Sequence, residues 1–246
     1  MRALLLPLAI AATSVAADIP LDKRLSGYEF MSRETRALQD DEATGPAVFA
    51  LLDGEALWKP CAGCHGDAAS SMNGVAARYP RFVVSKNAVL NLEQRINACR
   101  TDKLKAAAFA YESKELLALT AYVGRQSRGV PIAITLDEKT RPVLEQGRKL
   151  FFRRQGQLNL ACAQCHDERW GKKLAGSTIP QAHPTGYPIY RLEWQGMGSL
   201  ERRLRNCLSG VRAEPYAYGS PELVSLELYL MWRARGMPLE TPAVRP

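Results

Sequence analysis

The chain has 246 residues, enough for two modest domains, and its hydrophobic share of 46% is ordinary for a globular protein. Its formal net charge of +8 favours acidic proteins or small anions as partners. Beyond the first few residues no stretch approaches about 18 uninterrupted apolar residues, which excludes a membrane span.

The first segment, residues 1–17, is typical of a cleaved secretory signal. It begins with Arg2, continues with a short apolar run and ends in small residues. We predict cleavage after Ala16 or Ala17 and export to a bacterial periplasm, where nucleic acid is an unusual partner. Residues 18–45 follow as a charged N-terminal extension to which the sequence assigns no role.

Two copies of the pattern Cys-x-x-Cys-His stand out in the rest of the chain. CAGCH spans residues 61–65 and CAQCH spans residues 162–166. This pattern is the attachment signature for c-type haem, because one tight turn presents two thiols to one porphyrin edge and an imidazole to the iron. Zinc sites need cysteine pairs about 12 to 20 residues apart, and a thioredoxin-like pair needs no trailing histidine.

The sequence therefore predicts two covalently bound haem c groups. The attachment cysteines are Cys61, Cys64, Cys162 and Cys165, and the histidines that ligate the two irons are His65 and His166.

Two further cysteines follow the haem motifs at comparable distances. Cys99 lies 34 residues after His65, and Cys207 lies 41 residues after His166. The spacing of neighbouring apolar residues places each cysteine on the inward stripe of a predicted helix. We infer that both are distal thiolate ligands of iron. A disulfide between them and two inert core thiols remain open alternatives.

Other side chains fit the distal position less well. Methionine is the usual distal ligand, but no methionine occupies matching places after both motifs. Met197 follows the second motif at a suitable distance, whereas Met72 follows the first too closely. His183 lies among prolines and is predicted to be a loop residue rather than a ligand.

The two halves of the chain repeat each other. LEQRINAC (92–99) parallels LERRLRNC (200–207), and residues 111–131 parallel residues 218–238. Matching segments in the same order indicate an internal duplication.

Within each copy the local signals are helical. Ser113 and Ser220 are typical N-caps, and Gly129 and Gly236 are predicted to stop the helices that these serines begin. The predicted fold is all-α, with two tandem cytochrome c-like domains related by internal duplication. The domains span residues 46–132 and 133–246.

Several arginines surround the last cysteine. Arg203 precedes Cys207 by four residues and lies on the same helix face, while Arg202, Arg205 and Arg212 add positive charge nearby. Cations favour thiolate over thiol, so Cys207 is predicted to be a good ligand and a good nucleophile. Arg203 offers a planar fork for sulfonate or carboxylate oxygens, and a solvated basic face is the alternative.

The duplicated haem motif with later lone cysteines, the stretch HPTGYPIYRLEWQ (183–195) and the segment 199–223 around Cys207 resemble the SoxA family. This family is the dihaem subunit of the SoxAX cytochrome, an L-cysteine S-thiosulfotransferase of bacterial sulfur oxidation. The resemblance covers nearly the whole mature chain. It implies two cytochrome c-like domains, a SoxX partner with one haem, and oxidative joining of thiosulfate to a cysteine of the carrier SoxYZ. It also implies that a c-type cytochrome accepts the two electrons.

The resemblance also implies residue roles. Cys99 is implied as the distal ligand of the first haem and Cys207 as that of the second. Cys207 is further implied as the catalytic cysteine, which the family carries as a persulfide, and Arg203 as the substrate-binding arginine. Some relatives lack the first haem, but this sequence keeps every residue for it.

Two other functions stay open on the sequence. A dihaem electron-transfer cytochrome without transferase chemistry would use both thiolates only as ligands and its basic surface for docking. A dihaem peroxidase would need a displaceable iron ligand and an acid–base pair, and no convincing pair lies near either motif.

Overall fold

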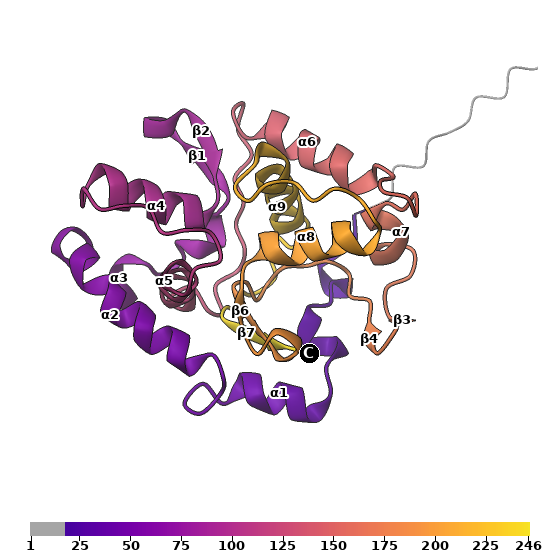
Figure 1. Cartoon of the computed structure of the whole chain (residues 1–246), viewed down its shortest axis with the longest axis horizontal. Helices are drawn as coiled ribbons and strands as arrows, with labels where there is room; N and C mark the ends of the chain where they lie inside the picture. Colours follow the sequence, from indigo (N-terminus) through magenta and orange to yellow (C-terminus); the bar gives the residue numbers. More distant parts are fainter. Residues whose placement is uncertain (1–17) are drawn as a thin grey trace, which may run out of the picture.

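The computed structural model describes residues 18–246 and is built mainly of helices (Figure 1). The expected signal peptide, residues 1–17, lies outside the described residues. The α-helices of the described part are α1 (Arg33–Asp40), α2 (Val48–His65), α3 (Ala68–Ser71), α4 (Leu92–Asp102), α5 (Lys114–Arg125), α6 (Arg141–Phe152), α7 (Cys162–His166), α8 (Leu200–Gly210) and α9 (Pro221–Arg233).

Short strands accompany the helices. They are β1 (Arg81–Val83), β2 (Ala88–Leu90), β3 (Lys173–Leu174), β4 (Ser177–Thr178), β5 (Ile189–Arg191), β6 (Gly196–Gly198) and β7 (Ala243–Arg245). β1 pairs antiparallel with β2, β3 with β4 and β5 with β6, and β7 adds to β5 in parallel. The all-α expectation thus describes the scaffold but omits these strands, because two or three residues are too few to show an alternating pattern.

The helix starts follow the predicted capping signals. The hydroxyls of Ser113 and Ser220 accept hydrogen bonds from the backbone N–H groups of Leu116 and Leu223, so both serines are N-caps as predicted. The helix ends differ from the prediction. α5 and α9 end before Gly129 and Gly236, which lie in the following turns with φ angles of 80° and 84°.

Each half of the chain has a pair of helices in close backbone contact. α2 packs against α5, and α6 packs against α9. A Cβ added at Gly54 would meet the carbonyl oxygen of Ala118 at 2.3 Å, and one added at Gly147 would meet that of Ser225 at 1.9 Å. Both glycines therefore let two helix backbones approach more closely than any side chain allows.

The same succession of elements occurs in both halves. In the first half, β1–β2 leads into α4 and then α5, and in the second half β5–β6 leads into α8 and then α9. Each hairpin turns through a 3-10 helix, η4 (Val84–Lys86) or η5 (Leu192–Trp194). Asn87 and Gln195, which follow these turns, are left-handed with φ angles of 48° and 49°.

The two halves meet through residues at matching positions. The rings of Tyr111 and Tyr218 stack with centroids 5.8 Å apart and an angle of 13° between their planes. Pro131 pairs with Pro238 in an antiparallel bridge. A matching place in each copy therefore touches its own counterpart across the junction.

Buried glutamates cluster at the same junction. Glu201 is 2% exposed and accepts hydrogen bonds from the Asn91 side chain at 3.1 Å and from the Gly219 backbone at 2.7 Å. The Asn91 amide also donates to Glu227 at 3.1 Å. Burial raises the pKa of Glu201 to about 7, and the neighbouring Glu93 adds to the shift. The cluster therefore holds carboxyl groups that favour their protonated form.

The N-terminal extension packs on the second half of the chain. α1 lies against β7, and the Gln39 side chain accepts a hydrogen bond from the Val244 backbone at 3.2 Å. Upstream, the Leu25 backbone N–H donates to the Gln181 side chain at 2.7 Å. The extension thereby forms one side of a cavity beside α7 and α8.

Candidate functional site

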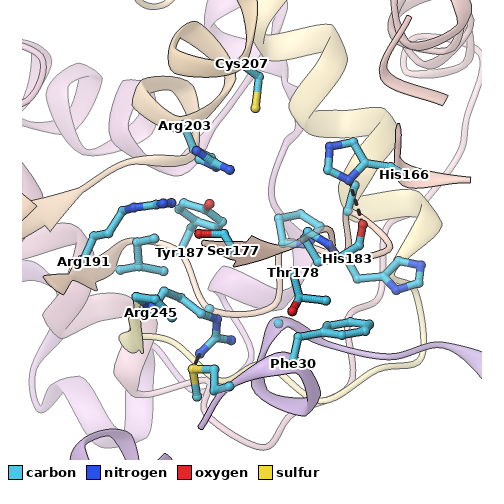
Figure 2. A pocket seen from close by; sticks show the side chains of 18 of the residues that line it. Phe30, His166, Ser177, Thr178, His183, Tyr187, Arg191, Arg203, Cys207 and Arg245 are labelled. Atoms are coloured by element: carbon cyan, nitrogen blue, oxygen red, sulfur yellow. Dashed lines mark hydrogen bonds between the residues drawn. The ribbon is translucent and has the colours of Figure 1, made fainter. Parts of the chain in front are cut away.

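A cavity of about 460 Å³ lies where α7, α8, β5 and the N-terminal extension meet (Figure 2). We call it the second cavity. His166 at the end of α7, Cys207 and Arg203 on α8 and Arg191 on β5 all contribute to its wall. Figure 2 shows the Cys207 sulfur and the His166 ring on opposite sides of open space.

His166 is held in the orientation that an iron ligand needs. Its Nδ1 atom lies 2.7 Å from the carbonyl oxygen of Pro180. Because a carbonyl oxygen only accepts hydrogen bonds, Nδ1 carries the proton and Nε2 keeps a free lone pair. Such a second contact is how proteins fix the tautomer of a metal-ligating histidine. The described residues of this cavity therefore fit a haem group between His166 and Cys207.

Cys207 lies in an environment that favours the thiolate. Burial raises the pKa of its thiol, but neighbouring groups, the positive charge of Arg203 among them, outweigh burial and hold that pKa below its ordinary value. Arg203 lies one helical turn before Cys207, as predicted, and both line the cavity. Burial lowers the pKa of Arg203, whereas the negative charge of the Cys207 thiolate raises it. The net shift is upward.

Arg202 and Arg205 are turned away from Cys207. Arg202 lies over the Trp194 ring at 4.2 Å, and Arg205 lies over the Tyr218 ring at 4.5 Å. Neither lines the second cavity. Their charges are packed on aromatic surface and are not available to a small anion beside Cys207.

A smaller cavity of about 210 Å³ lies in the first half of the chain, and we call it the first cavity. His65 and Cys61 from α2 line it together with Cys99 from α4. Arg95, one turn before Cys99, lines it as well. The residues therefore fit a second haem group between His65 and Cys99, with an arginine at the same relative place.

The remaining predicted attachment cysteines do not line either cavity. Cys64 is exposed at the end of α2, and Cys162 and Cys165 lie on α7. Burial raises the pKa of the Cys162 thiol to about 12. All three lie within the same helical turns as the histidines of their motifs.

The structure bears on whether Cys99 and Cys207 form a disulfide and on where the competing methionines lie. Each of the six cysteines is a free thiol, and Cys99 and Cys207 line different cavities, so no disulfide joins them. Met197 on β6 lines neither cavity. Met72 lines the first cavity, and its position seven residues after His65 keeps it the weaker candidate for an iron ligand there.

His183 is a loop residue, as predicted, and it also lines the second cavity. Its Nδ1 atom lies 3.0 Å from the Leu25 carbonyl oxygen, which ties the loop to the N-terminal extension. Burial lowers the pKa of His183 to about 4, so the ring is neutral at ordinary pH.

The sequence missed two other wall residues of the second cavity, Arg191 and Tyr187. Both lie in the resembling stretch 183–195, but neither belongs to a helical pattern that would have marked an inward face. Over residues 18–246 no group of three or more His, Cys, Asp or Glu side chains is arranged to hold a bare metal ion. No helix in that range is long and apolar enough to cross a membrane.

Comparison with known proteins gives the class first. The family model described as the SoxA/TsdA cytochrome c domain matches residues 44–132 and 146–239. The chain is thus a c-type cytochrome, a class whose haem c is covalently bound.

The comparisons then give the family. The L-cysteine S-thiosulfotransferase subunit SoxA of Pseudaminobacter salicylatoxidans is 38% identical, over 92% of this chain and 82% of its own. The SoxA subunit of Rhodovulum sulfidophilum is 34% identical, over 91% and 81%. The crystal structure of SoxXA from P. pantotrophus aligns with a TM-score of 0.87 at 29% identity, covering 91% of this chain and 87% of the other. The chain belongs to the SoxA family.

Proposed function

We propose that this chain is a subunit of an L-cysteine S-thiosulfotransferase that couples thiosulfate oxidatively to a cysteine of a carrier protein. The observation that carries the proposal is the place of Cys207, a half-buried thiol in the wall of the second cavity with Arg203 one turn away. The pairing puts a nucleophilic sulfur beside a fixed positive charge, which is what joining an anionic sulfur compound requires.

The haem assignment follows from the two cavities. The first haem would be attached at Cys61 and Cys64, and the second at Cys162 and Cys165. His65 and Cys99 would ligate the first iron, and His166 and Cys207 the second. Each histidine shares a cavity wall with its cysteine, which supports two haem c groups rather than one. When bound, haem supplies one-electron redox chemistry.

The domain organisation is part of the same proposal. Residues 46–132 and 133–246 would be two cytochrome c-like domains that arose by internal duplication. The repeated order of hairpin and helices, and the two separate ranges matched by one family model, support this division.

The chain's own residues account for the chemistry as follows. Arg203 binds the sulfonate oxygens of thiosulfate and brings its outer sulfur toward Cys207. Joining the Cys207 thiolate to that sulfur forms one S–S bond and releases two electrons, which a c-type cytochrome acceptor takes up. The carrier thiolate then attacks the sulfur next to the sulfonate, and the Cys207 thiolate leaves. Both anionic stages of Cys207 are stabilised by the same positive charge.

The partners follow from the family. The matching crystal structure is that of SoxXA, and we propose a SoxX-type monohaem cytochrome as the partner of this chain. The carrier would be of the SoxYZ type. Both would be met in the periplasm, to which the predicted signal in residues 1–17 directs the chain.

Peptide mass spectrometry of the protein from its native periplasm, together with a turnover assay, tests the proposal. We expect a haem on the Cys61/Cys64 peptide and another on the Cys162/Cys165 peptide, with a reducible extra sulfur on the Cys207 peptide. We also expect thiosulfate oxidation that requires the carrier. Two haems without such turnover, and with Cys207 always unmodified, would instead indicate an electron-transfer cytochrome.

A further inference from the structure

The arginine on β5 reaches the same space as the proposed substrate arginine. The side chain of Arg191 is 12% exposed and lines the second cavity with Arg203 and Cys207. Figure 2 shows the Arg191 and Arg203 guanidinium groups pointing toward the same part of the cavity, with the Tyr187 ring between and below them.

The first cavity provides a control within the same molecule. Residues 79–99 and 187–207 run in parallel without a gap, so Tyr79 matches Tyr187 and Cys99 matches Cys207. Arg203 has a counterpart in the first cavity, Arg95, which also lines the wall there. An arginine one turn before the cysteine therefore does not distinguish the two cavities.

Arg191 does distinguish them. Its counterpart is Val83, the last residue of β1, which does not line the first cavity. The two strands have the same hairpin register, since Val83 pairs with Ala88 and Arg191 with Gly196. The scaffold is thus the same, and the change is a guanidinium placed in the cavity wall from the strand position that Val83 occupies in the first half.

The charge of Arg191 is only partly committed within the protein. Its Nε and Nη2 atoms lie 2.8 and 2.7 Å from one carboxylate oxygen of Glu193, a side chain that is 64% exposed. Solvent screening weakens such a pair. Among residues 18–246 the Arg203 guanidinium makes no ion pair at all, whereas Arg245, the neighbour of Arg191 on β7, is paired with Glu240.

We propose that Arg191 is a second substrate-binding residue, which holds a sulfonate oxygen of the thiosulfate dianion jointly with Arg203. The inference rests on the proposed function. Two guanidinium groups match the two negative charges of the substrate, and together they fix where its outer sulfur points. The wall of the first cavity also holds a second arginine, Arg100, but its guanidinium lies 3.4 Å over the Phe109 ring and its Nε donates to the Ala107 carbonyl oxygen. We therefore expect the first cavity to lack a pair of arginines free for such a dianion.

Steady-state kinetics of the complete complex with its carrier test this inference. Charge-assisted hydrogen bonds of this type alter binding by about 10- to 100-fold, so Arg191→Gln is expected to raise KM for thiosulfate by that factor. The kcat value should stay within about twofold, because Cys207 and Arg203 remain. Arg191→Lys should recover part of the lost affinity as a point charge without the fork. Arg154→Gln removes the same charge from an exposed position and should leave KM unchanged.

Other outcomes would overturn the inference. An unchanged KM in Arg191→Gln, with a shifted haem absorption spectrum or midpoint potential, would mean that Arg191 binds a haem propionate instead. An equal rise of KM in Arg154→Gln would reduce the effect to net charge. If the wild type turns over thiosulfate normally, either of these two results overturns the role of Arg191 and leaves the proposed function intact. If the wild type shows no carrier-dependent turnover, both proposals are overturned.

Discussion

The first cavity, between His65 and Cys99, and the second cavity, between His166 and Cys207, are formed by the same succession of hairpin and helices. Their volumes differ by about twofold, 210 against 460 Å³. The larger one gains walls from the β3–β4 hairpin and the N-terminal extension, for which the first half has no counterpart. The comparison indicates that a redox scaffold becomes a candidate reaction site when one cavity is enlarged and charge is added, while a cysteine lines both cavities.

The largest contrast is expected between the two distal cysteines. Cys207→Ala should lower kcat/KM for carrier-dependent thiosulfate oxidation on the order of 10³-fold or more, because it removes the reacting sulfur. Cys99→Ala should lower it by about tenfold or less, because it removes only a ligand remote from the substrate. Stopped-flow or steady-state kinetics of both variants measure the difference. Mass spectrometry must first show that each variant keeps both haem groups on its peptides. Equal losses in the two variants would end the distinction between the cavities.

The helix contacts offer a second contrast that concerns stability. A methyl group at Gly147 collides with the α9 backbone, and one at Gly54 collides with the α5 backbone at a slightly longer distance. Each alanine variant should lose about 1–3 kcal/mol of unfolding free energy, with Gly147→Ala at the upper end. Denaturant titration measures the loss.

Gly210→Ala serves as the control for these two variants, since nothing lies within 4 Å of its added Cβ. It should leave the unfolding free energy nearly unchanged. A similar loss in all three variants would mean that helix contact is not the cause.

The smallest expected effect concerns the glutamates between the halves. Burial raises the pKa of Glu201 to about 7 in the folded protein, whereas an unfolded chain gives about 4.3. The stability that this proton supports is complete below about pH 4.3 and is lost as the pH rises through about 7. Glu201→Gln should therefore stabilise the protein at pH 8, on the order of 1–2 kcal/mol, and change little at pH 4.

Thermal unfolding at the two pH values measures that difference. Glu145→Gln, at an exposed position on α6, is the matched control and should shift stability by less than about 0.5 kcal/mol at either pH. If Glu201→Gln behaves like Glu145→Gln, the carboxyl at the junction is not held protonated by burial.

The sequence predicted helix caps and the positions of the haem motifs most directly. The two Cys-x-x-Cys-His motifs, the serine caps and the turn between Arg203 and Cys207 follow from spacing alone, because each depends on a few residues close together in the chain. The structure contains all of them at the predicted places on helices.

Features formed by distant segments were not predictable in this way. The strand that carries Arg191 is three residues long, and its orientation depends on β6 and β7 rather than on its own pattern. Glu201 looks like one more helix-surface charge until Asn91, 110 residues earlier, is placed beside it. The closing of the second cavity by residues 18–45 likewise depends on contacts with β7 that a local pattern does not contain.

The stacked pair Tyr111 and Tyr218 and the bridge from Pro131 to Pro238 join equivalent places of the two copies. Such self-facing contacts are what a two-fold symmetric dimer has at its axis. A mutation at an axis position meets its own counterpart, so it is tolerated only when the partner position accommodates it. Positions away from such an axis are free of that restriction, and the second cavity has Arg191 where the first half has Val83.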